Sequence, residues 1–466
     1  MVATKEFQVR VKKRERVVPM HPIVQHNLPL SNLDLLLPPK DVGVFLCYKR
    51  PSYSYRFWSF ELMVSTLKTA LAQALVHFYV FSGDVVRNSK GEAEILCNNQ
   101  GVEFVEAYAN IELCELNLHN PDESVEGKLL LPKQSRVLSV QATELKCGGI
   151  VVGCTFDHRI ADAYSGNMFL VSWAELANSK PLTMMPSFTK SFLNPRLPSS
   201  YDPSLNDMYI PISTLLPPRE NNNETPPCRN DPLLSRIYHV NAKEISHLQS
   251  QTNGTKLESF SAFMWKLISK HASISQNEPK VASSITCKMG IVVDGRTRLV
   301  INKGDNNSMH KKEIIGCYFG NVLSVPFGEK KLSDLIEKPL NLIAQDVHEF
   351  LRKVKSDEHF RDLIDWVEVH RPKLCLAKIY SNGRDDGPAF VVSSGQRFPV
   401  SKVDFGWGKP IFGSYHFPWG GNAGYVMPMP SSKGNGDWIV YMHLTQGQLE
   451  FIEKEASHVF KRFKLF

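Results

Sequence analysis

The chain has 466 residues, of which 42% are hydrophobic, so it is long enough for two or three domains with sizeable cores. Its 54 Lys and Arg residues against 47 Asp and Glu leave a formal net charge of +7, which is mild for this length. The densest basic cluster is KKRER at 12–16, and nucleic-acid binding needs a more concentrated basic face, so no nucleic-acid partner is predicted.

The composition of the N-terminus and the cysteine spacing bear on location. Residues 1–15 lack the apolar core of a secretory signal, and no stretch approaches the roughly 18 apolar residues of a membrane span, which predicts a cytoplasmic protein without a membrane partner. The nine cysteines include no C-x-x-C pair, as is typical of reduced thiols. No metal-ligand motif such as H-E-x-x-H is present, so no metal is expected.

Strand and helix patterns alternate along the first part of the chain, which predicts a mixed α/β fold. Leu62, Leu67, Leu71 and Leu75, for example, recur at helical spacing. In chain order, the patterns predict a strand near 7–11, a buried strand over 43–48, a helix over 60–78, a hairpin of strands over 136–145 and 149–156, and a helix over 161–177.

The character of the sequence changes between 181 and 232, where prolines and the polar run ENNNETPP replace sustained periodicity. This segment is interpreted as a connector between an N-terminal domain over 1–180 and a C-terminal domain over 233–466. Beyond it, the patterns predict helices over 257–270, 340–354 and 446–463, and strands over 284–296, 389–394 and 437–444.

A histidine lies where the second strand of the predicted hairpin ends, in the segment TFDHRIAD from Thr155 to Asp162. That end of a strand is where α/β folds expose reactive side chains, and a pKa near 6.5 suits histidine to remove a proton at neutral pH. The H-x-x-x-D spacing alone is common, so a structural role for His158 is the alternative. Asp162 either orients His158, if the helix begins at the histidine, or forms half of a structural ion pair.

A second segment, DFGWGKP from Asp404 to Pro410, alternates glycines with bulky aromatic residues. This pattern indicates a backbone that turns sharply or passes close to another group. It does not fit a phosphate-binding P-loop, and the absence of a G-x-S-x-G motif argues against a serine hydrolase.

Taken together, HRIAD and DFGWG resemble the BAHD family of plant acyl-CoA-dependent acyltransferases. Four further passages are similar to landmarks of that family in the expected order, and they extend the resemblance over essentially the whole chain: SNLDLLLPP from Ser31, SFSAFMWK over 259–266, VVDGRTRL over 292–299 and YFGNVL over 318–323.

The resemblance implies a fold and a mechanism. The fold would be α/β, with two similar-sized mixed-sheet domains of the CoA-dependent acyltransferase type, a long crossover loop and an active-site channel at the interface. His158 would act as general base on a small alcohol or amine, which would attack the thioester of acyl-CoA directly. Acyl-CoA would be a co-substrate and no cofactor would be permanently bound, and the expected state is a monomer.

The resemblance also assigns roles to residues around His158. Asp162 would point away from the channel and pair with Arg296, so that the pair fixes the histidine loop. Asp404 would be mainly structural, together with Gly406 and Gly408. An acid/base part for Asp404, as a second catalytic candidate, ranks below that structural role.

The resemblance is less complete in the region that would bind the oxyanion and CoA. Several relatives carry a Ser/Thr-Ser-Trp segment there, whereas this chain has Ser393-Ser394-Gly395, so an indole donor is missing and a wider acceptor side is expected. Ser393, Ser394 and Ser259 are the candidate contacts of acyl-CoA.

For the substrates, passages such as DVGVFLCYKR and FGSYHFPWGG are similar to family members that acylate coniferyl alcohol. They predict transfer of an acyl group, in the first place acetyl, to a phenylpropanoid alcohol such as coniferyl alcohol. The alternative is transfer of an aromatic or hydroxycinnamoyl-type acyl group to an amine or another alcohol. Rivals from other classes are a non-catalytic scaffold, which the intact motifs oppose, and a thioester hydrolase.

Overall fold

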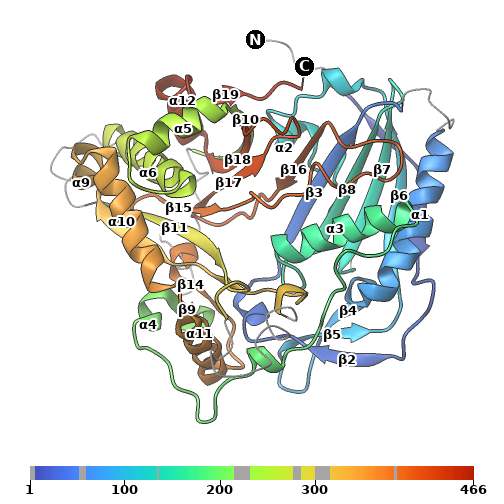
Figure 1. Cartoon of the computed structure of the whole chain (residues 1–466), viewed down its shortest axis with the longest axis horizontal. Coiled ribbons are helices and arrows are strands. Elements are labelled where there is room, and N and C mark those ends of the chain that lie inside the picture. The colour runs from blue at the N-terminus through green and yellow to red at the C-terminus, as the bar shows by residue number, and fades with distance from the viewer. Residues whose placement is uncertain are drawn as a thin grey trace, which may run out of the picture.

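Two large mixed β-sheets, each with its own helices, form the body of the molecule (Figure 1). The computed structural model describes residues 6–51, 59–133, 136–214, 231–275, 285–299, 315–381 and 386–465. One cluster of buried apolar side chains takes residues from both sheets, and a second lies between the second sheet and its helices. This arrangement confirms the predicted α/β class with two mixed sheets.

The first sheet holds the hairpin that leads to His158. Its strands, in sheet order, are β1 (Val9–Val17), β6 (Val102–Ala109), β7 (Leu138–Leu145), β8 (Ile150–Asp157), β3 (Asp41–Tyr48) and β16 (Phe412–His416). The strands β7 and β8 pair antiparallel, as the predicted hairpin requires. Helices α1 (Phe60–His77) and α3 (Ala163–Ala177) pack together, and the indole of Trp173 donates a hydrogen bond to the carbonyl of Leu67 at 2.9 Å. A smaller sheet is formed by β2 (His26–Pro29), β5 (Ala93–Cys97) and β4 (Asp84–Arg87).

Strand β16 comes from the C-terminal half of the chain but completes the first sheet. It pairs antiparallel with β3, with Phe412 opposite Cys47 and His416 opposite Gly43, and Figure 1 shows this red strand beside the blue β3. Gly43 allows the close approach, because a Cβ there would lie 3.1 Å from the carbonyl oxygen of His416. The boundaries 1–180, 181–232 and 233–466 stay a prediction, and sheet membership departs from them at β16.

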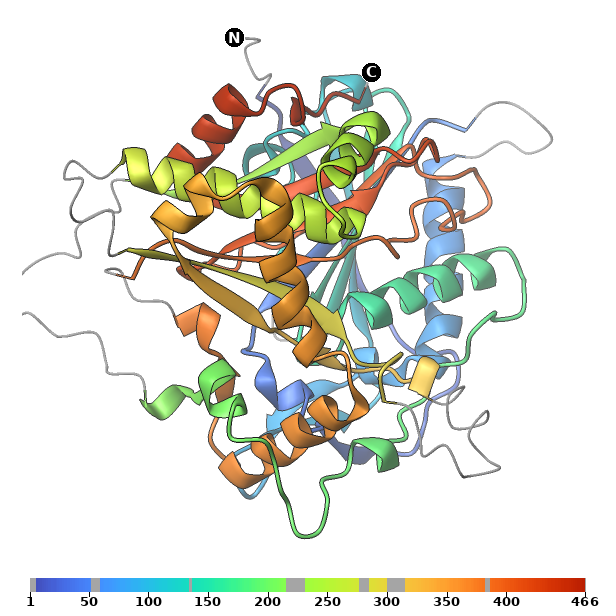
Figure 2. The ribbon, with the colours of Figure 1, turned by 60° about the vertical axis from the view of Figure 1, so that its left-hand side comes forward.

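The second sheet lies beside the first and carries more of the helices. Its strands, in sheet order, are β12 (Leu323–Ser324), β11 (Thr286–Asp294), β15 (Ala389–Ser393), β17 (Gly424–Pro430), β18 (Trp438–Thr445), β10 (Leu233–Val240) and β19 (Lys461–Arg462), with β13 (Phe327–Lys331) also beside β11. The helices packed with this sheet are α5 (Ala242–Ser250), α6 (Lys256–Ile274), α9 (Leu332–Glu337), α10 (Leu340–Lys353) and α12 (Gln446–Glu455). Figure 2 shows the yellow-green α6 and the orange α10 lying over it.

The described part of the connector contains short regular elements. Helix α4 (Leu205–Met208) leads into β9 (Tyr209–Pro211), which pairs with β14 (Cys375–Ala377), and α11 (Asp357–His370) contacts α4. The polar run ENNNETPP lies outside the described residues.

The C-terminal helix is shorter than its apolar pattern predicts. A capping box of Thr445 and Gln448 begins α12, which ends at Glu455. The prediction that it continues to 463 is wrong, because β19 at the end of the chain pairs with β10 instead. Among the described residues, no helix combines the length and the apolar content needed to cross a bilayer.

Candidate active site

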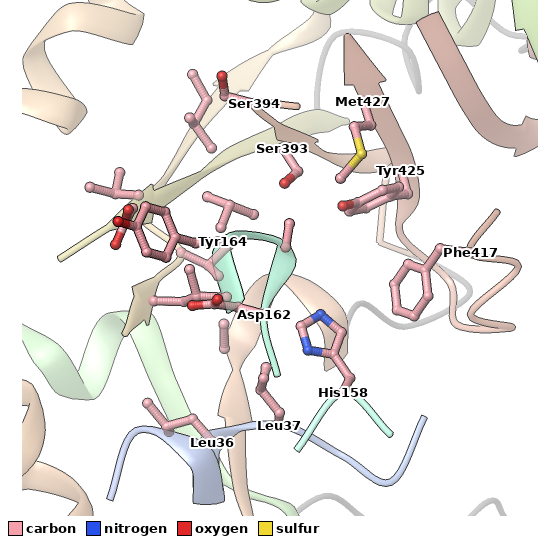
Figure 3. Close-up of a pocket in the computed structure, with 18 of the residues that line it drawn as sticks. Leu36, Leu37, His158, Asp162, Tyr164, Ser393, Ser394, Phe417, Tyr425 and Met427 are labelled. Carbon is pink, nitrogen blue, oxygen red and sulfur yellow. The ribbon is translucent and has the colours of Figure 1, made fainter. Parts of the chain in front are cut away.

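A cavity of about 620 Å³ takes its wall from both halves of the chain. His158 and Phe156 line it from the first sheet and its loops, and Ser393, Tyr425 and Met427 line it from the second sheet. In Figure 3, the imidazole of His158 reaches into this space with the side chains of the second sheet across from it. The predicted base therefore lies on a cavity that a substrate can occupy.

The His158 loop is fixed by its backbone. His158 follows the last residue of β8, and its amide donates a hydrogen bond to the carbonyl of Lys40 at 2.9 Å. The His158 carbonyl accepts a hydrogen bond from Nδ2 of Asn321 at 3.0 Å. The ring meets that of Phe417 edge to face, with 5.7 Å between centroids. The direction of the imidazole is thus set from several sides before any substrate binds.

Burial controls the protonation of His158. It lowers the pKa of the imidazole below its ordinary value of 6.5, and the negative charges of Asp162 and Asp157 offset only part of that effect. The Nδ1 atom is buried and has no hydrogen-bond partner. At neutral pH the ring is therefore uncharged, which is the state that a general base needs.

We expect the activity to depend on pH through this group. Because the pKa of His158 is lowered, kcat/KM should rise with pH along an acid limb whose midpoint lies below 6.5 and then level off. Initial rates of thiol release measured across the acid range would give the midpoint. An acid limb centred above about pH 7 would contradict a neutral, buried imidazole in the free enzyme.

Asn321 supports the loop that carries His158, and no motif in the sequence assigned it this role. Its amide N and Nδ2 donate hydrogen bonds to Oδ1 of Asp34 at 2.7 and 3.0 Å, while Nδ2 also reaches the carbonyls of His158 and Arg159. The other oxygen of Asp34 accepts hydrogen bonds from the amide and hydroxyl of Ser31. The passages SNLDLLLPP and YFGNVL, noticed only as landmarks, therefore meet directly under His158.

Asp162 does not lie on a helical face with His158, because α3 begins only at Ala163. Asp162 is the N-cap of that helix and accepts a hydrogen bond from the amide of Ser165 at 2.9 Å. The structure therefore excludes the alternative in which the Asp162 carboxylate orients His158 from the same helical face. In Figure 3 the Asp162 carboxylate is directed away from the imidazole.

The predicted partner of Asp162 is in place. Nη1 of Arg296 donates to Oδ2 of Asp162 at 2.7 Å and Nη2 donates to Oδ1 at 3.2 Å. The two residues are 1% and 3% exposed, so the pair is shielded from water. Nη2 of Arg296 also donates to the hydroxyl of Ser165 and to the carbonyl of Gly320, and the guanidinium lies 4.5 Å from the ring centre of Tyr164. The pair joins the start of α3 to the loops of the second half.

Asp404 lies in a tight loop, and none of residues 404–408 lines the cavity. Its Oδ1 accepts hydrogen bonds from the amides of Gly406 at 2.8 Å and Gly408 at 3.0 Å, which closes the loop on itself. The rings of Phe405 and Trp407 are buried against Tyr48. The geometry therefore supports the structural role and does not support Asp404 as a second catalytic residue, because its carboxylate is held by backbone outside the cavity.

The glycines of this loop make a prediction about stability. Gly406 and Gly408 have φ of 110° and 111°, a region that side-chain-bearing residues avoid. Gly408→Ala should cost about 1–3 kcal/mol of unfolding free energy through backbone strain alone, because a Cβ there meets no atom within 4 Å. The matched control is Gly127→Ala, which is equally open but has φ of 67° and should shift the thermal midpoint less. Equal shifts would contradict the argument.

The three predicted CoA contacts divide into two groups. Ser393 and Ser394 line the cavity. Ser259 does not, since it is fully buried and its hydroxyl is bonded to Thr252 and to the carbonyl of Thr255. The prediction for Ser259 is not supported, because it lies on the covered side of α6. The start of α6 still reaches the cavity through Thr255, Leu257 and Glu258.

Gly395, the position at which the family resemblance led us to expect a tryptophan, lies against a neighbouring strand. Its amide donates a hydrogen bond to the carbonyl of Pro428 at 2.9 Å. A Cβ at this position would lie 2.5 Å from Cγ of Met429 and 2.9 Å from the carbonyl of Pro428. A larger side chain at 395 would therefore require the neighbouring strand to move.

Two mixed-sheet halves share a cavity, and an uncharged imidazole lies on its wall. Residues 7–459 match the model of the Transferase family, and the chain belongs to this family, the BAHD acyl-CoA-dependent acyltransferases. It is therefore an acyltransferase enzyme.

Individual proteins agree with this assignment. A hydroxycinnamoyltransferase of Narcissus pseudonarcissus is 27% identical and aligns over 98% of this chain and 99% of its own. Shikimate O-hydroxycinnamoyltransferase of Nicotiana tabacum is 28% identical, over 96% and 99% of the two chains. The crystal structure of TRI101 from F. sporotrichioides, complexed with coenzyme A and T-2, superposes with a TM-score of 0.70 at 14% identity and covers 93% of this chain and 99% of its own. That likeness supports the fold.

Proposed function

We propose that His158 removes the proton from an acceptor hydroxyl in the cavity and that the acceptor oxygen then attacks the carbonyl carbon of an acyl-CoA. A carbon–oxygen bond forms, the carbon–sulfur bond breaks, and the CoA thiolate takes back the proton from the imidazolium. The observation that carries this proposal is an uncharged imidazole, held by backbone hydrogen bonds, on the wall of a cavity of about 620 Å³. No covalent enzyme intermediate is needed.

For the donor site, we propose that acyl-CoA extends along the strand end that carries Ser393 and Ser394, whose side chains line the cavity. The TRI101 crystal structure contains coenzyme A in a protein of the same fold, which supports acyl-CoA as the donor. Acyl-CoA would be a co-substrate and not a resident cofactor. The monomeric state and the cytoplasmic location stay predictions.

For the acceptor, an uncharged aromatic alcohol fits the surroundings of His158 best. Apolar and aromatic side chains dominate the wall near the imidazole, as Figure 3 shows: Leu36, Leu37, Phe417, Tyr425 and Met427. Such a wall binds a ring by excluding water from it, while the hydroxyl of the ligand turns to the base. Coniferyl alcohol, predicted from the sequence passages, has this chemistry.

Two donors are candidates. The names of the two curated relatives favour a hydroxycinnamoyl-type acyl group, which was the alternative in the sequence analysis and takes the first place here. Acetyl, which the sequence analysis put first, is the second candidate here.

The test is a panel of donors against acceptors, with thiol release as readout and the product identified by mass. Acetyl-CoA and a hydroxycinnamoyl-CoA would each be offered with coniferyl alcohol and with an aromatic amine, and His158→Ala would serve as control. Ester formation with coniferyl alcohol that disappears in the variant supports the proposal, and the faster donor identifies the acyl group. Exclusive amide formation overturns the acceptor, and thiol release that ignores the acceptor indicates a hydrolase.

A further inference from the structure

A group of potential metal ligands lies outside the cavity, at the junction of the two halves. Asp122 is in the short helix α2 (Pro121–Ser124), Glu126 follows that helix, and His416 is the last residue of β16. Within the described ranges, these three residues are the group whose ligand atoms all lie within 4.8 Å of one another. No sequence motif indicates the group, because His416 is far along the chain from Asp122 and Glu126.

The group contains buried polar atoms without hydrogen-bond partners. His416 is 3% exposed, yet neither of its ring nitrogens makes a hydrogen bond, and its Nε2 lies 3.5 Å from Oε2 of Glu126. Oδ1 of Asp122 is likewise buried without a partner, whereas Oδ2 accepts a hydrogen bond from the amide of Ser235 at 2.6 Å. Buried polar atoms are nearly always satisfied in proteins, so their convergence on one point indicates a ligand.

We propose that Asp122, Glu126 and His416 bind one divalent transition-metal ion, with Zn²⁺ as the best match. An imidazole with two carboxylates suits Zn²⁺, whereas Ca²⁺ and Mg²⁺ prefer oxygen ligands only. Tetrahedral Zn²⁺ would bring the ligand atoms to roughly 3.4 Å from one another, so the group must close by about an ångström. The side chain of Glu126 is 54% exposed and free to make that movement.

The position of the group assigns the ion a structural role. None of its three residues lines the cavity, so the ion does not contact the substrates. The carboxylate of Asp122 accepts a hydrogen bond from the amide of Ser235 in β10 of the second sheet, and His416 is the last residue of a strand of the first sheet. The next residue, Phe417, packs against the ring of His158. A bound ion would therefore brace the junction behind the active-site wall.

The experiment uses the full-length, untagged protein after treatment with EDTA and buffer exchange. ZnCl₂ is titrated in competition with a chromophoric chelator, and the thermal midpoint is recorded with and without ZnCl₂. We expect one equivalent of Zn²⁺ per chain and a midpoint that rises on binding. Glu126→Gln, an exposed change that spares the core, should lose this binding, and so should His416→Asn.

Two histidine variants serve as matched controls. His158→Ala removes the cavity histidine. His239→Asn removes a half-buried histidine whose Nε2 lies 2.9 Å from Oδ2 of Asp437 but that belongs to no group of three potential ligands among the described residues. Both should still bind one equivalent. The proposal is overturned if the wild type binds no stoichiometric Zn²⁺, if Glu126→Gln binds as the wild type does, or if Ca²⁺ binds as tightly as Zn²⁺. These outcomes do not depend on the acyl transfer proposed above.

Discussion

His158→Ala is expected to lower kcat by about 10²–10⁴-fold, the range over which general bases contribute to catalysis. The imidazole is the uncharged base on the cavity wall, and the nearby carboxylate of Asp162 is tied to Arg296 and directed away from it. KM should change little, because the alanine removes the proton acceptor and leaves the apolar wall intact. Initial rates of acceptor-dependent thiol release at saturating substrate measure the effect.

The matched comparison is Asp404→Asn, which tests the other catalytic candidate. Because the Asp404 carboxylate accepts hydrogen bonds from Gly406 and Gly408, this change should lower the thermal midpoint and leave kcat of the folded enzyme close to that of the wild type. A loss of kcat as large as that of His158→Ala, at an unchanged midpoint, would return Asp404 to the catalytic residues. Retained activity in His158→Ala would contradict the assignment of His158 as the general base.

The elements that lead to the site could be predicted because their signals are local. Apolar residues at helical spacing predicted α1 within one residue, and alternating runs around a turn predicted the β7–β8 hairpin. Helix α3 begins two residues later than predicted, since Asp162 caps it. Helix α11 was missed although Phe360, Leu363, Ile364 and Val367 follow helical spacing, so its signal was present in the sequence.

Contacts between distant segments could not be predicted from residue patterns. No residue pattern around Phe412–His416 indicates that β16 pairs with β3 of the other half. The hydrogen bond between Asp34 and Asn321 joins residues 287 positions apart, and it arises only when both halves have folded. The prediction that Ser259 contacts CoA is not supported for a related reason. The sequence does not show whether a serine at the start of an amphipathic helix faces the cavity or the core.

The pairing of Asp162 with Arg296 was predicted only through the family resemblance. Breaking this pair is expected to have the second large effect, a loss of stability. Asp162→Ala is expected to cost about 3–5 kcal/mol of unfolding free energy, because it removes the buried partner of the Arg296 guanidinium and leaves only Asp294, which is partly exposed, 3.2 Å away. The change also removes the cap of α3 and the acceptor for the amide of Val322. Urea midpoints at fixed pH would measure it.

Pairing itself is tested by a double-mutant cycle with Arg296→Met. If the loss comes from an uncompensated charge, the double variant should be less destabilised than the sum of the single changes. The control is Glu349→Gln, which breaks an exposed pair with Arg352 and should change stability by no more than about 0.5 kcal/mol. If Asp162→Ala kept full stability and lost kcat, the carboxylate would act on His158 through the loop. Additive losses would instead mean that capping outweighs the ion pair.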